Sequence, residues 1–313
     1  MSAFAKAAAT LAAASIATAA LAVGTAARTV PDPDAGAPSA ASSVAASAGP
    51  PRRVASINLC ADQLLLELAA PGQILSLSRL ATDPAASHHV ARAAGLPTND
   101  GGAESVLALD PDVVLVGEYS DRYTVRLLEA RGLDVRTLPL ADSVEATLAN
   151  LELVGGWIGR EGAARDRVRD LRERLDAVER EKATATGKGT RPLAAVYDPN
   201  GYTVGPSSLR GEMLARAGFA NVAEQAGIEG YGSLALETLL RRAPDVLIDS
   251  PYSAGTWSRA QALATHPALR SRGLDPGVVT LASADTICGG PWTVDLIERL
   301  ARERRAIERR AER

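Results

Sequence analysis

One pattern occurs twice in this chain, and it limits the fold more than any other feature of the sequence. Residues 104–115 read Glu-Ser-Val-Leu-Ala-Leu-Asp-Pro-Asp-Val-Val-Leu, and residues 237–248 read Glu-Thr-Leu-Leu-Arg-Arg-Ala-Pro-Asp-Val-Leu-Ile. Proline disfavours helix in the residue before it, so each copy predicts a short helix that ends there. The continuous apolar run that follows is typical of a parallel strand buried on both faces. The repeat therefore predicts two homologous lobes.

Strands and helices alternate along the chain from Arg52 onward. Residues 52–57 form a short β-like run, residues 62–68 follow a helical pattern, and residues 73–77 read as the next strand. Pro71-Gly72 ends the helix between them. Such alternation is typical of a parallel sheet with crossover helices, so we expect an α/β protein with Rossmann-like lobes.

A long helix is predicted between the lobes, over residues 161–185. Its apolar residues recur at helical spacing among dense charges: Val168, Leu171, Leu175 and Val178. A helix with one apolar stripe is either an ordinary surface helix or a stiff strut between domains. We expect it to join a first lobe, residues 52–160, to a second lobe, residues 190–313, which ends in a charged terminal helix.

The first 51 residues differ in composition from the rest. Residues 1–27 carry one lysine before an alanine-rich apolar run with small-residue cleavage sites, which predicts a signal peptide. A buried alanine-rich helix is the alternative. Residues 28–51 have almost no large apolar side chains, so we expect a flexible linker. No cysteine lies near the cleavage sites for a lipid anchor, and no later stretch has the ~20 apolar residues of a membrane span. We expect an exported, soluble protein of a Gram-negative periplasm.

Charge and motifs argue against several classes of function. The net charge is -3 and the pI is near 5.8, which argues against nucleic acid as a partner. The three histidines, His88, His89 and His266, have no carboxylate at metal-ligand spacing beside them. We expect the adjacent pair of histidines to lie in a solvent-exposed loop, and we expect no metal site.

The sequence also lacks the motifs of an enzyme. No nucleophile motif surrounds Cys60 and no glycine-rich phosphate loop is present, so we expect no catalytic residue. A zinc- or manganese-binding protein and an enzyme remain as alternatives of other classes.

An ordered set of features resembles the periplasmic binding proteins for vitamin B12 and ferric siderophores. The set comprises Arg53-Val54-Ala55-Ser56, the paired Glu…Pro-Asp units, the single long helix and the turn Tyr202-Thr203-Val204-Gly205. The resemblance covers about Arg52 to Ala301. It implies two α/β lobes joined by a single long α-helix, with the ligand in the cleft between them. The ligand it implies is a transported metal chelate, a corrinoid or a ferric siderophore, and the protein itself needs no cofactor. A haem-binding protein of the same fold stays open.

The resemblance also implies a partner, the permease dimer of an ABC importer in the inner membrane, to which a monomer delivers its ligand. In the family, a glutamate on each lobe meets permease arginines, and the matching residues here are Glu104 and Glu237. The alternative for each is an ordinary carboxylate at a helix N-terminus, where the helix dipole favours negative charge.

Aromatic residues line the cleft in relatives that bind vitamin B12, and Tyr197, Tyr202 and Tyr231 fall on such positions. Their rings suit a flat macrocycle, although a tyrosine at a strand end can also merely cover the core. Thr98 and Gly117 stand where the first lobe of those relatives has large rings, and Tyr119 is the nearest substitute. This departure keeps siderophores and haem open as ligands.

Residues that follow strand ends are expected to line the cleft of open α/β lobes. On this rule we expect the following cleft residues: Asn58, Leu59, Cys60, Arg79, Glu118 and Tyr119 from the first lobe, and Asp285, Cys288, Gly289, Gly290 and Trp292 from the second. The two cysteines are the only ones in the chain. We favour two inert, partly buried thiols, while a disulfide formed in an oxidising compartment and a contact to a soft metal centre both stay open.

Overall fold

The computed structural model describes residues 49–185, 191–250, 266–271 and 278–313. The predicted signal peptide, residues 1–27, and the predicted linker as far as residue 48 lie outside this range.

Five parallel strands form the sheet of the first lobe, in the order β3-β2-β1-β4-β5. This order places the first strand in the middle, which is the arrangement of doubly wound α/β folds. The elements are β1 (Val54–Ser56), α1 (Leu59–Leu68), β2 (Ile74–Ser78), η1 (Arg79–Thr82), α2 (Val90–Ala93), β3 (Thr98–Asn99), α3 (Ala103–Leu107), β4 (Val113–Gly117), α4 (Arg122–Ala130), β5 (Asp134–Leu138) and α5 (Val144–Trp157).

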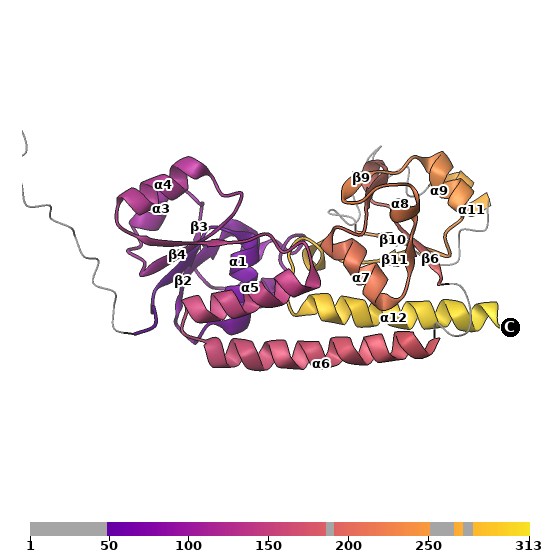
Figure 1. The fold of residues 1–313 in the computed structure, drawn as a ribbon. Coiled ribbons are helices and arrows are strands. Elements are labelled where there is room, and N and C mark those ends of the chain that lie inside the picture. Colours follow the sequence, from indigo (N-terminus) through magenta and orange to yellow (C-terminus); the bar gives the residue numbers. More distant parts are fainter. Residues whose placement is uncertain (1–48, 186–190, 251–265, 272–277) are drawn as a thin grey trace, which may run out of the picture. The chain divides into compact units, whose positions relative to one another are not determined.

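The second lobe has a parallel sheet in the order β11-β10-β6-β8 and a separate antiparallel pair, β7-β9. Figure 1 shows this lobe in orange, after the long helix α6 (Glu161–Ala185). The elements are β6 (Leu193–Val196), η2 (Pro199–Gly201), β7 (Tyr202–Val204), α7 (Leu209–Ala217), β8 (Ala220–Asn221), α8 (Val222–Gln225), β9 (Tyr231–Ser233), α9 (Leu236–Arg242), β10 (Val246–Asp249), α11 (Pro267–Ser271), β11 (Val278–Thr280), η3 (Ser283–Asp285) and α12 (Trp292–Ala311). The predicted α/β class is confirmed.

The sequence repeat corresponds to equivalent strand junctions in the two lobes. Asp112 precedes β4, and its Oδ2 atom accepts hydrogen bonds from the backbone N–H groups of Arg52 and Arg53, at 2.7 and 2.9 Å. Asp245 precedes β10, and its Oδ2 atom accepts one from the N–H of Leu193, at 2.7 Å. In each lobe the aspartate thus fixes the start of the neighbouring parallel strand, β1 or β6. This contact explains why the repeat keeps aspartate directly after proline.

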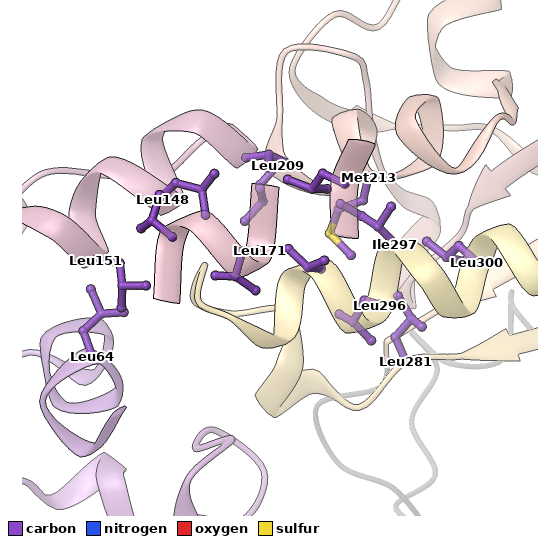
Figure 2. Packing of buried hydrophobic residues seen from close by; sticks show 14 of the residues in the cluster. Leu64, Leu148, Leu151, Leu171, Leu209, Met213, Leu281, Leu296, Ile297 and Leu300 are labelled. Carbon is purple, nitrogen blue, oxygen red and sulfur yellow. The ribbon is translucent and has the colours of Figure 1, made fainter. Parts of the chain in front are cut away.

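The long helix α6 buries the apolar stripe that the sequence indicates, since all four stripe residues are at most 8 % exposed. It packs against α5 of the first lobe and against α7 and α12 of the second. Figure 2 shows the resulting core, which runs without interruption from one lobe to the other through Leu64, Leu148, Leu151, Leu171, Leu209, Met213, Leu296, Ile297 and Leu300. We call the four helices α5, α6, α7 and α12 the helical hub.

Ion pairs fasten the two longest helices of the hub along their length. Arg174 of α6 donates to Glu298 and Asp295 of α12, at 2.8 to 2.9 Å and 2.5 Å. Further along, Arg304 of α12 is only 3 % exposed and contacts Glu181 of α6 at 3.3 Å. The helices lie side by side in Figure 1, in agreement with these contacts. Within the described ranges, no helix is long and apolar enough to cross a membrane.

Candidate ligand-binding site

A hollow of about 160 Å³ opens at the carboxyl ends of the first-lobe strands β1, β4 and β5. Its lining includes several residues expected there and several that the sequence analysis missed: Asn58, Cys60, Leu64, Gly117, Glu118, Tyr119, Leu138, Pro139, Leu140, Ala141, Asn150, Ile287, Cys288 and Gly289. The last three come from a segment far along the chain. The rule for strand ends indicated residues on both sides of this hollow, since Cys288 and Gly289 were expected there as well as the first-lobe residues, whereas Ile287 was not.

The absence of a large ring at Gly117 has a local cause. Asn58 begins α1, and its Oδ1 atom accepts a hydrogen bond from the Ala61 N–H at 3.0 Å. A Cβ atom at position 117 would lie 2.3 Å from the Asn58 Nδ2 atom, so no side chain fits there while the cap is in place. Tyr119, two residues on, is 82 % exposed and supplies the aromatic surface at this edge.

Cys60 and Cys288 form a disulfide, with Cα atoms 5.3 Å apart. The interpretation as two free thiols is therefore wrong. The bond joins the first turn of α1 to the residues before α12, and both cysteines line the hollow.

Residues 283–292, which we call the wall segment, lie late in the sequence but pack on the first lobe. The Nδ1 atom of His88 lies at hydrogen-bond distance, 2.6 Å, from the Asp285 Oδ1 atom. The Ser283 hydroxyl donates to the carbonyl oxygen of Ala85. The ring of Trp292 stacks on that of His88, with centroids 4.5 Å apart.

The expectation that the adjacent histidines lie in a solvent-exposed loop holds for His88, which is exposed, and is wrong for His89. His89 is 8 % exposed, and its Nε2 atom lies 3.3 Å from a carboxylate oxygen of Glu67. His88 is held between Asp285 and Trp292. No group of three or more histidine, cysteine or acidic side chains in the described part of the chain is close enough together to hold a metal ion.

Two tyrosines form an exposed aromatic surface on the second lobe. Tyr202 in β7 and Tyr231 in β9 are 39 % and 60 % exposed, and their rings stack with centroids 6.2 Å apart and planes 17° from parallel. The antiparallel pairing of β7 with β9 sets this spacing, because Tyr231 lies opposite Val204 and Tyr202 lies opposite Ser233. The structure thus brings together two of the three tyrosines expected to contact a ligand.

A polar network that the sequence analysis missed leads from the second-lobe strand ends to the wall segment. Arg210 lies 2.7 Å from Asp198, and both side chains are mostly buried. Asp198 also accepts a hydrogen bond from the Ser250 N–H at 2.8 Å, and the Ser250 and Thr286 hydroxyls are 2.7 Å apart. Arg210 is the second residue of α7 and no motif surrounds it, so nothing in the sequence singled it out.

A buried carboxyl group lies beside this network at the end of β10. Burial raises the pKa of Asp249, and the Thr280 side chain partly offsets this by a hydrogen bond to it. The carboxyl edge of the second lobe therefore carries acidic groups and one arginine that is already paired.

Two aromatic residues that we expected to line the cleft are buried instead. Tyr197 is 1 % exposed and belongs to the second-lobe core with Leu234 and Leu239. Its burial, with a smaller contribution from the charge of Glu237, raises the pKa of its phenol. Trp292 is 2 % exposed, and its indole N–H donates to the carbonyl oxygen of Cys288 at 3.2 Å. Neither ring offers surface to a ligand.

Arg79, Glu104 and Glu237 lie on exposed surface, whereas Leu59 and Gly290, which we also expected in the cleft, are buried. Arg79 begins η1 and contributes its charge to the surroundings of Asp100, outside the lining of the hollow. Glu104 and Glu237 both stand in the first turn of a short helix, α3 or α9, that has no side-chain cap. Glu104 and Glu237 therefore occupy equivalent positions in the structure of the two lobes as well as in the sequence repeat.

Comparison with known proteins identifies the family. The sequence profile described as "Periplasmic binding protein" matches residues 54–272, which is more than half of the chain. The chain belongs to the periplasmic binding protein family.

Two curated proteins are similar to this chain in sequence. A "Cobalamin-binding protein" of Halobacterium salinarum is 28% identical over 200 residues, which cover 63% of this chain and 53% of the relative. The match thus spans about half the length of that curated relative. An "Uncharacterized ABC transporter substrate-binding lipoprotein YvrC" of Bacillus subtilis is 24% identical over 264 residues, covering 80% of this chain and 79% of the relative.

A solved structure shares the fold of this periplasmic binding protein. The "Periplasmic heme-binding protein RhuT from Roseiflexus sp. RS-1 in apo form" superposes with a TM-score of 0.66 at 19% identity. The superposition covers 83% of this chain and 99% of the other.

Proposed function

We propose that this periplasmic binding protein captures a corrinoid-type metal chelate and delivers it to an ABC importer. The observation that carries the proposal is the exposed, stacked pair Tyr202 and Tyr231 at the carboxyl edge of the second lobe. Two exposed aromatic rings side by side on neighbouring strands offer aromatic surface of the kind that a large planar macrocycle contacts. Tyr119 offers a third ring from the first lobe.

The charges at the site favour a ligand without strongly acidic groups. Among the described residues at the second-lobe edge, Arg210 is the cation, and Asp198 already pairs with it. Glu118 and Tyr119 line the first-lobe hollow, where no cation is present in the described lining. A corrinoid with amide side chains can hydrogen-bond to such groups, whereas a polyanionic chelate would be repelled. The similarity to the halobacterial cobalamin-binding protein supports the same ligand class.

The size of the hollow supports binding between lobes rather than in one of them. Sites for small molecules usually measure about 300–1,000 Å³, and the first-lobe hollow measures about 160 Å³. A macrocycle could therefore place only one edge in it. We infer that the rest of the ligand lies against the second-lobe tyrosines.

Haem is a second candidate, favoured by one specific observation. Tyr231 is 60 % exposed, and a phenol oxygen is a ligand type that iron accepts. The fold of a haem-binding protein, RhuT, superposes on that of this chain. Haem carries propionates, however, and the described site offers them no unpaired cation.

Equilibrium binding to the mature chain distinguishes these candidates. We expect cyanocobalamin to raise the melting temperature and to bind more tightly than haemin or a ferric hydroxamate chelate. Tyr202→Ala and Tyr231→Ala should each weaken cyanocobalamin binding by about 1–3 kcal/mol. Tyr123→Ala is the control, because Tyr123 is a tyrosine that is even more exposed, 82 %, and lies on α4 outside the hollow.

The outcome decides between ligand classes. If haemin binds and both Tyr231→Ala and Tyr231→Phe abolish its absorbance shift, haem is the ligand. If Tyr123→Ala weakens binding as much as the Tyr202 and Tyr231 variants do, the proposed site is wrong.

The proposal includes export and soluble release into a periplasm, for which residues 1–27 and the family membership are the support. Mass spectrometry of the periplasmic fraction should find a mature chain that begins between Val23 and Arg28. Intact protein with Met1 in the cytoplasm would contradict export.

A further inference from the structure

The wall segment, residues 283–292, belongs by sequence to the second half of the chain but is fastened to the first lobe at three points. The disulfide links Cys288 to Cys60 at the start of α1. The Asp285 carboxylate lies at hydrogen-bond distance from the His88 ring, and the Ser283 hydroxyl donates a hydrogen bond to the Ala85 carbonyl oxygen. Each contact joins residues about two hundred positions apart in the sequence, so none can form locally. We call these three contacts together the clasp.

The clasp is sheltered by a small apolar cluster of its own. Leu59 and Ala86 of the first lobe are buried against Cys288 and Trp292, separately from the main core. The Trp292 ring stacks on His88 with centroids 4.5 Å apart and planes 18° from parallel. This cluster would lose half of its members if the wall segment moved away.

The other side of the wall segment touches the helical hub and the second lobe. A Cβ atom on Gly289 would lie 2.4 Å from the Thr147 Oγ1 atom of α5 and 3.2 Å from Leu209 of α7. The Thr286 hydroxyl lies 2.7 Å from that of Ser250, at the end of β10. The segment thus lies between the two lobes and has direct contacts with both.

The same segment provides one side of the candidate site. Ile287, Cys288 and Gly289 line the hollow together with Asn58 and Tyr119 of the first lobe. Ile287 is 44 % exposed, so it offers apolar surface at the opening. The position of these three residues therefore determines how wide the hollow is.

We propose that the clasp is a positioning device for the ligand site: the Cys60–Cys288 disulfide holds the wall segment against the first lobe and so fixes the width of the cleft. A dithiol that transfers two electrons and two protons converts the disulfide to two thiols, becomes a cyclic disulfide itself, and frees the wall segment. The oxidised protein has a preformed cleft, and the reduced protein has one whose wall moves. Preorganisation of this kind lowers the entropy lost on binding.

Hydrogen exchange of the full mature chain tests this proposal without any ligand. The chain has two cysteines, so a dithiol such as dithiothreitol can reduce only this bond. We expect reduction to speed exchange of the wall-segment amides and of residues 85–89 by at least about tenfold, while amides of β4 and β10 stay protected. The Cys60→Ser/Cys288→Ser double variant should reproduce this pattern. Asp285→Asn should produce a smaller increase at the same places.

The control separates local release from general destabilisation. Leu239 is fully buried in the second-lobe core, away from the clasp. Leu239→Ala should therefore speed exchange in the second lobe without selecting the wall segment. Equal exchange of the wall segment in the oxidised and reduced chains, or a uniform increase along the whole chain, would overturn the proposal. If the double variant does not fold, the wild type reduced under native conditions and Asp285→Asn still decide it.

A second measurement tests whether the clasp affects ligand affinity. This measurement rests on the proposed function. If the oxidised wild type binds cyanocobalamin, reduction should raise the Kd about tenfold, mainly through faster dissociation. An unchanged Kd would overturn the positioning role. If the wild type does not bind cyanocobalamin, the ligand assignment fails, and the exchange experiment alone decides about the clasp.

Discussion

Ala243 and Asp110 are the residues before the two repeat prolines, and both have a left-handed backbone although neither is glycine. Their φ angles are 46° and 50°. At Ala243 this conformation ends α9 directly, whereas Asp110 lies three residues after the end of α3, in the turn that leads into β4. Non-glycine residues in this region cost on the order of 1 kcal/mol or more, and a following proline restricts them further.

We predict that Ala243→Gly stabilises the protein by about 0.5–1 kcal/mol, because glycine adopts a positive φ without strain. Urea unfolding measures the change. Ala215→Gly is the control, since Ala215 is exposed inside α7 and glycine in a helix costs about 1 kcal/mol. If both variants lost stability equally, the strain attributed to position 243 would be absent.

Asp62 makes stability depend on pH in an unusual direction. It is fully buried in α1, where burial raises the pKa of its carboxyl from 3.8 to about 7 in spite of hydrogen bonds from Ser56 and Ser78. Between these two pH values the folded protein binds more protons than the unfolded chain. Its contribution to stability is therefore greatest at low pH and is lost as the pH rises from about 4 to about 7.

Asp62→Asn should remove this dependence, because the amide resembles the protonated acid and can still bond to Ser78. We expect the variant to gain stability relative to the wild type as the pH rises from 4.5 to 8, by an amount on the order of 4 kcal/mol at most. The difference between the two proteins, measured by urea unfolding at each pH, cancels the effect of other carboxylates. A constant difference across this range would contradict the raised pKa of Asp62.

At the scale of elements, the junction between α7 and α12 depends on a glycine that no sequence pattern marked. Gly218 ends α7 with φ at 95°, and a Cβ atom there would lie 2.8 Å from Cδ of Arg304. Arg304 needs this close approach, because its Nε atom donates to the carbonyl oxygen of Ala217 at 3.0 Å. The glycine and the buried arginine thus fix how the terminal helix lies on the second lobe.

We predict that Gly218→Ala destabilises the protein more than Gly95→Ala does, by about 1–3 kcal/mol. Both glycines have a positive φ, so both variants incur the same backbone penalty. Only at position 218 would the new methyl group also displace Arg304, because nothing lies within 4 Å of a Cβ atom at Gly95. Equal melting temperatures for the two variants would show that Arg304 adjusts without cost.

The elements that the sequence predicts well are those with a strong local pattern. The stripe Val168, Leu171, Leu175 and Val178 sufficed to locate α6, and the repeat sufficed to locate α3, β4, α9 and β10. The wall segment has no such pattern. Ser283, Asp285 and Cys288 find their partners on the first lobe, about two hundred residues away. Such pairings depend on how the hub arranges the lobes, which periodicity does not encode.

The candidate site was likewise predictable only where a local pattern marks its residues. Positions after strand ends correctly indicated Asn58 and Tyr119, because parallel strands end at a common edge. Exposure was not predictable, so Tyr197 and Trp292 were expected at the surface and lie in the interior. A ring at a strand end can face either the cleft or the core, and only the packing of Leu234 or His88 around it decides.

For the whole molecule, one prediction concerns delivery to the importer. Glu104 and Glu237 stand at equivalent helix starts in the two lobes and are both exposed, so a twofold partner could contact both alike. Glu104→Ala and Glu237→Ala should leave cyanocobalamin affinity unchanged and lower uptake into cells, because a permease arginine would lose its partner. Glu→Arg at either position should lower uptake more than Glu→Ala.

The control for delivery is Glu161→Ala, which removes an exposed carboxylate from the first turn of α6, outside the repeat. It should transport as the wild type does. Normal uptake by the double variant of Glu104 and Glu237 would show that these residues are only helix-start carboxylates. Loss of cyanocobalamin binding in either single variant would place them at the ligand site instead.

The placement of the wall segment also has a consequence for the order in which this chain can fold. Leu59 and Ala86 are among the first core residues to be synthesised, yet their buried neighbours Cys288 and Trp292 are among the last. A chain that emerges from its N-terminus therefore holds an incomplete first lobe, with Cys60 unpaired, until nearly all of it has emerged. Contacts of such long sequence separation slow folding, since a large loop must close before they form. The two lobes, although each has its own parallel sheet, are thus expected to be completed together rather than in turn.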